Sequence, residues 1–423
     1  MTRLLRFDMP ATGEGRRWVI GVRAGSQCRE VRAALVAAAG HGLEMTPAVV
    51  GAMTAEVPRS ARTLFAADGP GGECPAAALA GLRAQLAEIQ ASLVQELLAE
   101  LGVAPSRVLA LGVDDPGLWH FQGSVPVGYA GLCDAARLAE WTGLSVIDAF
   151  PARDLAQGGQ GGPLAALPEW LLLRDAQKSR VLVKLGRTIR TSYLPASTED
   201  RPAARVLSFD AGPGTSLLDR LAERLTAGEH HFDPGGRLAV QGRRLPELLE
   251  HWLADPYFDR PPPRWHPLGV RPERFLTESL ELAVREDWSV RDLLCTATHF
   301  LAQTVAAALT RRLPEDARID EVIVSGGGQR NGLLLHEMGR AVELPLVKAE
   351  QLDAPDEALG AAAVAVLALL AIDRVPANPT SITGADIPRV LGRFTPGSPQ
   401  QWQRLLGVIA GTEPAARPLR SAV

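Results

Sequence analysis

The chain has 423 residues, and its 44 Lys and Arg against 48 Asp and Glu give a formal net charge of −4. This slightly acidic balance excludes the broad basic surface that nucleic-acid binding requires. The length suffices for two or three domains or for one bilobal unit, and the 46% of hydrophobic residues can fill a large core.

The first 17 residues are polar and charged, so we expect no signal peptide. No window offers about 18 uninterrupted apolar residues, and we expect no transmembrane helix. The cysteines, Cys28, Cys74, Cys133 and Cys295, lack the CxxC spacing of zinc sites and of disulfide frameworks, which favours isolated buried thiols. These features predict a cytoplasmic protein without a metal cage that binds neither nucleic acid nor membrane.

Short apolar segments alternate with segments of helical periodicity along the chain. Strands are predicted at 18–22, 108–111, 144–147, 181–185, 206–209 and 321–324. Helices are predicted at 30–39, 78–101, 135–141, 216–225, 290–312 and 332–342. The Ala-rich stretch 358–372 is too short to span a membrane and is expected to be a buried core helix. Repeated strand–Gly loop–helix units predict an α/β protein with largely parallel sheets.

Segment 255–274 is a long Pro-rich excursion inside the predicted fold, and loops of this length are usually functional or disordered. Its aromatic residues Tyr257, Phe258 and Trp265 favour packing, with ring stacking on a sugar as the alternative. Residues 19–25 and 181–187 are both apolar strands that enter a turn with Gly and Arg, an echo that fits a duplicated fold.

Three glycine-rich segments are the candidates for chemistry. Asp154 precedes a loop with four glycines, Asp210 is followed by Gly-Pro-Gly, and Gly326–Gly328 lie between a strand and a helix. Glycine allows a ligand to approach the backbone, and a helix N-terminus offers N–H groups to an anion. None of the three is a P-loop or a dinucleotide fingerprint. Each alone is explained equally well by a tight turn, but together they favour a phosphate or nucleotide site.

Six collinear segments resemble the anhydro-N-acetylmuramic acid kinases, a bacterial sugar-kinase family. The resemblance runs from about residue 19 to residue 391. Its best-matched segments are FPARDLAQGGQGGPL at 150–164, FDAGPGTSLLD at 209–219, DPYFDRPPP at 255–263, SGGGQRNGLL at 325–334, DEALGAAAVA at 356–365 and PANPTSITGA at 376–385.

The resemblance implies a two-lobed α/β protein of the actin/hexokinase-like fold, a duplicated ribonuclease H-like architecture with a central cleft. We expect an N-terminal lobe at 1–145 and a C-terminal lobe at 146–410, with a return of the chain end to the first lobe as an alternative. The segment 411–423 is small, polar and expected to be a flexible tail.

In the family, ATP transfers its γ-phosphate to the sugar 6-oxygen while a water attacks the anomeric carbon and opens the 1,6-anhydro bridge. The resemblance assigns Asp154 as the base toward that water, a role that suits a carboxylate. It also implies ATP and Mg²⁺ as cofactors, with a sugar and a nucleotide as partners, and it is compatible with a homodimer. No metal ligand is assigned. The matching phosphate- and nucleotide-binding residues are Gly25, Ser26, Gly186, Asp210, Gly212, Gly214, Gly326, Gly327, Gly328 and Asn331, and the sugar-binding ones are Gln160, Glu273 and His120.

This sequence departs from the family pattern in both phosphate hairpins. The first hairpin carries Arg29, Glu30 and Arg32 where the family has Asp, Gly and Asp, and the second carries Lys184, Arg187 and Arg190 in a segment that is neutral in the family. The family's HGQT segment is replaced at 114–117, and its QIGD sugar contact is missing near 127–129. An arginine repels a divalent cation, but it can bind a phosphate directly.

Three hypotheses remain open from the sequence. The first is an ATP-dependent kinase of an anhydro amino sugar in peptidoglycan recycling, favoured by Asp154 and by the collinear segments. The second is a catalytically impaired pseudokinase paralogue that keeps the fold, with or without sugar or anion binding, and it is favoured by the hairpin departures. The third is a phosphotransferase that acts on a different sugar.

Overall fold

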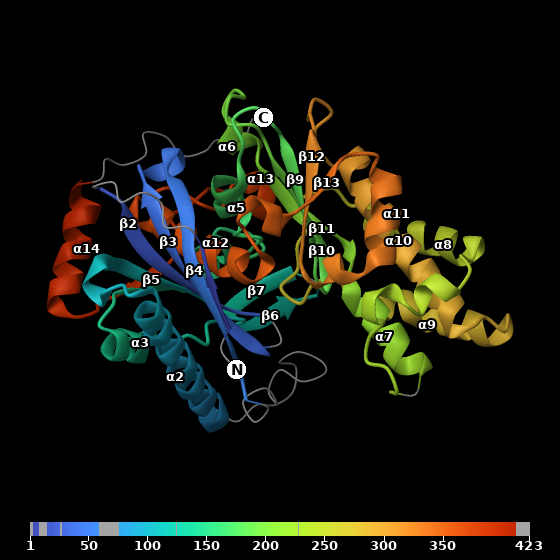
Figure 1. Ribbon diagram of the computed structural model, residues 1–423, viewed down its shortest axis with the longest axis horizontal. Coiled ribbons are helices and arrows are strands. Elements are labelled where there is room, and N and C mark those ends of the chain that lie inside the picture. Colours follow the sequence, from blue (N-terminus) through green and yellow to red (C-terminus); the bar gives the residue numbers. More distant parts are fainter. Residues whose placement is uncertain are drawn as a thin grey trace. The chain divides into compact units, whose positions relative to one another are not determined.

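The structure is a computed structural model that describes residues 3–7, 15–25, 28–58, 76–123, 125–226 and 228–411. The chain forms two compact units (Figure 1). Unit 1 comprises residues 1–173 and 352–423, and unit 2 comprises residues 174–351. The chain therefore leaves unit 1 once, builds the whole of unit 2, and returns.

Unit 1 is built on a seven-stranded sheet with the order β1-β4-β3-β2-β5-β8-β14. Helices α2 and α12 pack on this sheet. A separate hairpin is formed by β6 and β7. The strands are β1 Arg3–Arg6, β2 Arg17–Ala24, β3 Glu30–Ala39, β4 Thr46–Glu56, β5 Val108–Asp114, β6 Leu118–Gln122, β7 Val125–Ala130, β8 Val146–Asp148 and β14 Arg393–Thr395. The helices are α2 Ala76–Leu101, α3 Ala135–Thr142, α4 Phe150–Leu155, α5 Ala166–Leu173, α12 Asp356–Ile372, α13 Thr380–Thr383 and α14 Pro399–Gly411.

Helix α12 is the buried core helix predicted from its Ala-rich sequence. It lies so close to β2 that a Cβ on Gly21 would be 2.0 Å from the carbonyl oxygen of Ala361. The small side chains of the helix and the glycine of the strand together permit this approach. The opposite face of β2, with Ile20 and Val22, belongs to the core that includes α2.

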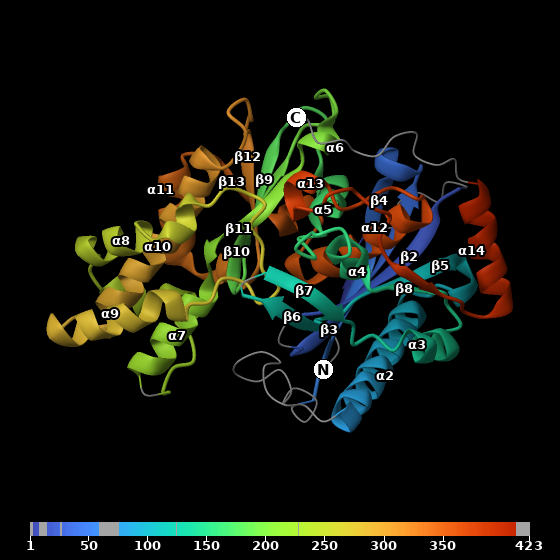
Figure 2. The ribbon, with the colours of Figure 1, turned by 180° about the vertical axis from the view of Figure 1, so that it is seen from behind.

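Unit 2 contains a five-stranded sheet with the order β11-β10-β9-β12-β13. Helices α7 and α10 pack on one face of this sheet, which carries the hydrophobic core of the unit (Figure 2). The strands are β9 Arg180–Leu185, β10 Thr188–Leu194, β11 Leu207–Pro213, β12 Glu321–Ser325 and β13 Leu346–Lys348. The helices are α6 Pro202–Arg205, α7 Thr215–Leu225, α8 Pro246–Leu253, α9 Glu273–Arg285, α10 Val290–Arg311 and α11 Gly332–Val342.

The two sheets repeat one topology. In each, the first three strands of the repeat are antiparallel neighbours, and the fourth and fifth strands then add in parallel beside the first. Numbered within each repeat, both sheets have the order 3-2-1-4-5, with β2 and β9 as the first strands. The duplicated ribonuclease H-like architecture is therefore confirmed, and the echo between residues 19–25 and 181–187 reflects it.

Two of the secondary-structure predictions were wrong. The segment Glu30–Ala39 is a strand and not a helix, and the sheets are mixed because each contains an antiparallel three-stranded part. Both faces of β3 are buried, so its apolar residues do not alternate with polar ones and the period of two is hidden. The abundant alanines of this strand then favour a helical interpretation.

The predicted lobe boundary at residue 145 also differs from the observed division. Residues 146–173, which include α4 and α5, belong to unit 1, as do residues 352–423. These two segments belong to unit 1 because the strand β8 pairs with β5 and the helix α12 packs against it. Within the described residues the chain ends in α14 at Gly411, and the predicted tail after it lies outside them.

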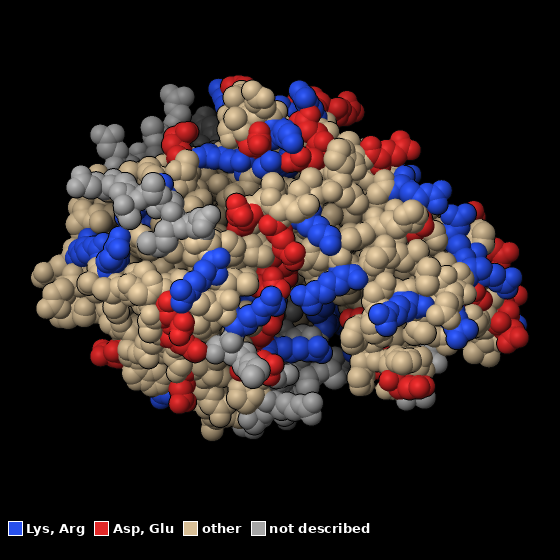
Figure 3. All heavy atoms as spheres, viewed as in Figure 1, with Lys and Arg blue, Asp and Glu red and all other residues tan. Residues whose placement is uncertain are grey.

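Among the residues that the structure describes, only α10 is long and apolar enough to span a membrane. In its most apolar window, 72% of the residues are buried, as in the core helix of a globular unit. On the face shown in Figure 3, acidic and basic side chains are interspersed, in agreement with the near-neutral composition. Cys28, Cys133 and Cys295 are buried thiols that form no disulfide, as predicted, while Cys74 lies outside the described residues.

Candidate functional site

Asp154 lies in the short helix α4, directly after the buried strand β8. The residue is 0% exposed. Its backbone carbonyl accepts hydrogen bonds from the N–H groups of Gln157 and Gly159, which closes the helix into the glycine-rich loop. The sequence therefore places the carboxylate at a fixed point where a strand end, a helix and a loop meet.

Three donors hold the Asp154 carboxylate. The Gly161 N–H donates to Oδ2 at 2.7 Å, and Asn378 Nδ2 donates to Oδ1 at 2.7 Å. The Thr383 side chain makes a further hydrogen bond to the carboxylate. Asn378 is itself fixed, because its Oδ1 accepts a hydrogen bond from the Arg389 N–H at 2.5 Å.

The pKa of Asp154 is raised above its ordinary value, chiefly because burial disfavours the charged form. The hydrogen bonds from Thr383, Asn378 and Gly161 oppose this effect, since they stabilise the carboxylate. A carboxylate with a raised pKa is a stronger base than an exposed aspartate, yet these donors keep it available in its ionised form.

Two glycines of the loop are required by close contacts. A Cβ on Gly159 would lie 2.2 Å from Asp154 Oδ2, and a Cβ on Gly161 would lie 2.7 Å from the Trp119 ring. Gly161 also has φ +83°, which disfavours other residues. The glycines thus allow the loop to close over the carboxylate, and Trp119 packs against this loop.

The loop is attached to the segment that carries Asn378 and Thr383. Gln160 donates its backbone N–H to the Thr383 carbonyl at 2.8 Å, and the Asp386 N–H donates to the Gln157 carbonyl at 2.8 Å. The Gln160 side chain, predicted to bind the sugar, is half-buried beside this attachment. His120, also predicted to bind the sugar, is exposed on β6, and Gly25 is exposed at the end of β2, while Ser26 lies outside the described residues.

Asp115, in the segment that replaces the family's HGQT, is a buried carboxyl that sequence reasoning passed over. It accepts hydrogen bonds from the N–H groups of Gly117, Leu132 and Cys133 at 2.8, 2.9 and 3.0 Å. Burial nevertheless raises its pKa to about 6. Asp115 therefore ties the β6–β7 hairpin segment to the end of β5.

In the first hairpin, two departures from the family pattern compensate each other. Arg32 forms an ion pair with Glu30 at 2.5 Å and another with Asp356 at 3.4 Å. Arg29 is exposed at the turn before β3. The Arg32 cation therefore lies between two carboxylates and is not an isolated positive charge.

In unit 2, the three predicted phosphate and nucleotide turns meet at one end of the sheet. The register pairs Thr188 with Pro213 and Lys184 with Ser325, so the β9–β10, β11–α7 and β12 turns share an edge. The N–H groups of Gly214 and Thr215 donate to the carbonyls of Arg187 and Gly186, each at 2.8 Å. These two hydrogen bonds hold the β9–β10 turn against the N-terminus of α7.

Close backbone contacts explain most of the glycines at this edge. A Cβ on Gly214 would lie 2.1 Å from the Gly186 carbonyl oxygen, and a Cβ on Gly328 would lie 2.7 Å from Leu185 Cβ. A Cβ on Gly326 would lie 2.7 Å from the Leu185 carbonyl oxygen. Around Gly327, by contrast, no described atom lies within 4 Å of such a Cβ. Gly327 is therefore the glycine of this loop that faces open space.

Three other predicted residues have structural contacts of their own. Gly212 faces α10, where a Cβ would lie 2.6 Å from Thr304 Cγ2. Asn331 caps α11, because its Oδ1 accepts a hydrogen bond from the Leu334 N–H at 3.0 Å. Glu273 is exposed in the first turn of α9, where Oε1 lies 3.8 Å from Arg220 Nε.

Asp210 is buried in the middle of β11. Burial raises its pKa, and the Arg190 guanidinium opposes that shift. Tyr257 and Arg264 of the Pro-rich segment both donate to the Asp210 backbone carbonyl, at 2.9 and 2.8 Å. The aromatic residue Tyr257 therefore packs within unit 2, in agreement with the packing alternative.

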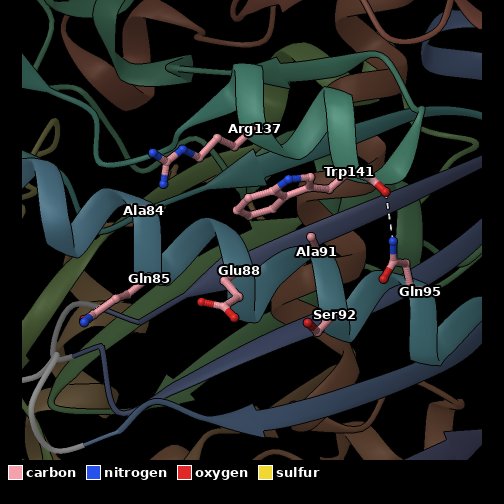
Figure 4. Close-up of a pocket in the computed structure, with 8 residues that line it drawn as sticks. All are labelled: Ala84, Gln85, Glu88, Ala91, Ser92, Gln95, Arg137 and Trp141. Atoms are coloured by element: carbon pink, nitrogen blue, oxygen red, sulfur yellow. Dashed lines mark hydrogen bonds between the residues drawn. The ribbon is translucent and has the colours of Figure 1, made fainter.

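A surface groove of about 560 Å³ lies between α2 and α3 (Figure 4). Its lining includes Glu88, Gln95, Arg137 and the half-exposed Trp141, whose carbonyl accepts a hydrogen bond from Gln95. None of the predicted site residues lines this groove, which separates it from the chemistry around Asp154.

Comparisons with known proteins identify the family of this chain. A family model described as anhydro-N-acetylmuramic acid kinase matches residues 17–397. Relatives of that name include one from Nitrosospira multiformis, 36% identical over 318 residues, which are 74% of this chain and 81% of the relative. Another, from Gloeobacter violaceus, is 32% identical over 391 residues, which are 89% of this chain and 98% of the relative. The chain belongs to the anhydro-N-acetylmuramic acid kinase family.

Solved structures of sugar kinases are more distant from this family member. Gluconate kinase from Lactobacillus acidophilus aligns with a TM-score of 0.43 at 9% identity, over 94% of this chain and 96% of that one. The ROK family glucokinase from Streptomyces griseus aligns with a TM-score of 0.39 at 14% identity, over 83% of this chain and 98% of that one. The fold assignment therefore rests on the strand order of the two sheets.

Asn378 and Thr383 are the partners of the Asp154 carboxylate that sequence reasoning missed. Both lie in the segment at 376–385 that resembles the family, but the resemblance supplied no role for them. Their side chains are buried and both contact the Asp154 carboxylate. The available signal was a run of small polar residues around Pro379 that is unusual next to the apolar helix α12.

Proposed function

We propose that this chain is an ATP-dependent kinase that opens the 1,6-anhydro bridge of anhydro-N-acetylmuramic acid and phosphorylates its O6, in peptidoglycan recycling. Membership in the family supports the substrate and the reaction. The observation that carries the proposal is the Asp154 carboxylate, held by Asn378 and by the Gly161 N–H at 2.7 Å each. A buried aspartate with ordered donors on both oxygens suits a base that must act in one orientation.

The reaction balances with Asp154 as the base. The water oxygen bonds to the anomeric carbon as the C1–O6 bond breaks, and Asp154 accepts the proton from the water. O6 bonds to the γ-phosphorus as the bond from that phosphorus to the ADP oxygen breaks. The products are the 6-phosphorylated sugar, ADP and the proton on Asp154, which later passes to solvent.

The glycine-bearing turns of unit 2 support nucleotide binding there. Three turns that share one sheet edge, with Gly327 facing open space, leave room for an approaching ligand at the backbone. The exposed Arg187 adds positive charge at the same turn. We assign the phosphates of ATP to this edge and the sugar to the surroundings of Asp154.

The hypothesis of an impaired paralogue rested on the hairpin departures. Arg32 and Arg190 each form an ion pair with a carboxylate, so their positive charges are balanced within the folded chain. These contacts leave Asp154 and its donors intact, so we favour the enzyme. The location in the cytoplasm and the homodimer remain predictions.

Mass spectrometry of the product tests the proposal. Incubation with ATP and 1,6-anhydro-N-acetylmuramic acid should yield a sugar heavier by one water and one phosphoryl group. A product heavier by the phosphoryl group alone would contradict the role of Asp154 in adding water. Recovery of unchanged sugar would contradict the kinase and favour the impaired paralogue, and turnover of a different anhydro sugar or hexose would favour the third hypothesis.

A further inference from the structure

Three charged side chains share one face of the unit 2 sheet. The register pairs Arg190 with Lys184 of β9 and with Asp210 of β11. Directly opposed residues point to the same side of a sheet, and neighbours along a strand point to opposite sides. Since Val183 and Leu185 belong to the core under α7 and α10, Lys184, Arg190 and Asp210 lie on the face turned away from that core.

Arg190 and Asp210 form an ion pair on this face. Arg190 Nε lies 3.2 Å from Asp210 Oδ1, and the exposed fractions of the two side chains are 23% and 2%. The aspartate is therefore buried beneath an arginine that itself reaches solvent. Together with Lys184 the three side chains carry a net charge of about +1, which favours an anion at this face.

The other oxygens of Asp210 also have donors from the protein. The His266 N–H donates to Oδ2 at 3.3 Å. Tyr257 Oη and Arg264 Nε both donate to the backbone carbonyl. The Asp210 carboxylate therefore accepts hydrogen bonds from Arg190 and His266, and its backbone carbonyl is held separately.

A divalent cation does not fit the surroundings of Asp210. Mg²⁺ requires oxygen ligands in near-octahedral geometry, whereas the buried carboxylate here faces a guanidinium that repels a metal ion. Throughout the described part of the chain, His, Cys, Asp and Glu residues form no group of three that could hold a metal. The Mg²⁺ that the family implies thus lacks ligands at the aspartate where the resemblance placed the phosphates.

We propose that Arg190, held by Asp210, binds the phosphates of ATP directly, so that this chain binds ATP without a divalent cation. The inference rests on the proposed kinase function and deepens it. A guanidinium is a planar fork of donors that matches phosphate oxygens, and Asp210 orients it through Nε. Arg190 is the third residue of β10, opposite Lys184 and near the β9–β10 turn, where Gly186 contacts Gly214 at the edge assigned to the nucleotide.

Calorimetric titration of ATP into the full chain, once with Mg²⁺ and once with EDTA, tests the inference. The natural protein should bind ATP in EDTA with a Kd within about threefold of the Kd in Mg²⁺. Arg190→Asn should weaken binding in EDTA by about tenfold or more, because the phosphate contact is lost. The same variant should regain affinity when Mg²⁺ is added, because the Asp210 carboxylate is released.

Arg318→Asn is the matched control. It removes the same charge from unit 2, but Arg318 is 75% exposed and precedes the start of β12, whereas the glycine turn follows the end of that strand. Arg318 pairs there with Asp320. Its ATP affinity should equal that of the natural protein in both conditions. If Arg190→Asn fails to fold, Arg190→Lys takes its place, because it retains a cation beside Asp210. Arg190→Lys should lose ATP affinity in EDTA, and added Mg²⁺ should not restore that affinity.

The outcomes separate the two proposals. ATP binding by the natural protein only in the presence of Mg²⁺ would overturn the inference and leave the kinase in place. Equal affinities of the natural protein and of both Arg190 variants in EDTA would also overturn it. Absence of ATP binding in both conditions would overturn the proposed kinase and the inference together.

Discussion

Asn378 donates a hydrogen bond to Asp154 across 224 positions of the chain, with 2.7 Å between Nδ2 and Oδ1. The contact joins α4, which follows β8, to the segment between α12 and α13. Since a second donor holds Asn378 itself, the orientation of the carboxylate is determined by backbone groups on both sides. The return of the chain to unit 1 is what completes the surroundings of the proposed base.

Asp154→Asn should lower kcat by about 10²–10⁴-fold, because an amide cannot accept the proton from the attacking water. The Kd for ATP should be unchanged, since the nucleotide is assigned to unit 2. Steady-state kinetics and ATP calorimetry measure the two quantities. Asp373→Asn is the control for a buried carboxylate in the same unit: it breaks the ion pair with Arg17 and should lower Tm while kcat persists. Full activity of Asp154→Asn would refute the assignment of the base.

Asn378→Ala should move the acidic limb of the kcat/KM profile to higher pH. Its hydrogen bond lowers the pKa of Asp154, so removal of the bond raises that pKa further, and the base becomes protonated over a wider acidic range. Thr383→Val, which keeps the shape of the side chain, should shift the limb in the same direction. A uniform loss of rate with an unmoved pH profile would show that these residues support only the fold.

Asp115 should make the protein less stable as pH rises from about 4 to about 6. Burial raises its folded pKa from 3.8 to about 6, so the native state holds its proton over this range while the unfolded state releases it. The corresponding contribution to the free energy of unfolding is about 3 kcal/mol, present below pH 4 and lost above pH 6.

The difference in stability between the natural protein and Asp115→Asn isolates this effect. Urea unfolding at a series of pH values should show that the difference falls by about 3 kcal/mol between pH 4 and pH 7. Other titrating groups are common to both proteins and cancel in the difference. A difference that stays constant with pH would mean that the backbone donors keep Asp115 ionised throughout.

Gly214→Ala and Gly327→Ala should have opposite consequences for folding. The methyl group at residue 214 meets the Gly186 carbonyl at 2.1 Å, so the β9–β10 turn must move, at a cost of about 1–3 kcal/mol in stability. At residue 327 the methyl group enters open space, and Tm should be preserved. A reduced ATP affinity of Gly327→Ala with an unchanged Tm would place the nucleotide at this loop. An unchanged Tm of Gly214→Ala would contradict the close contact.

The positions of the three glycine-rich turns could be predicted because each follows an apolar strand. Carboxyl ends of parallel strands meet at one edge of a sheet, and the structure places Gly214 and Gly326 at one such edge. The pairing of Arg190 with Asp210 could not be predicted. It depends on the register of β10 and β11, which contains an irregularity between Ile189 and Arg190 that leaves no signal in the sequence.

The strand β3 and the role of Asn378 show two further limits. A strand buried on both faces has no alternation, and its alanines resemble a helix. Asn378 lies in an irregular segment far from Asp154 in sequence, and only the packing of α12 against β2 and β5 brings the segment back to unit 1. Long-range contacts of this kind require the tertiary structure.

The release of ADP is the most direct measurement of the central claim that this chain is a kinase with Asp154 as its base. A coupled assay with ATP should detect ADP only when 1,6-anhydro-N-acetylmuramic acid is present, and Asp154→Asn should abolish the signal. Equal release of ADP without the sugar, or no release by a natural protein that also binds no ATP at millimolar concentration, would contradict the claim.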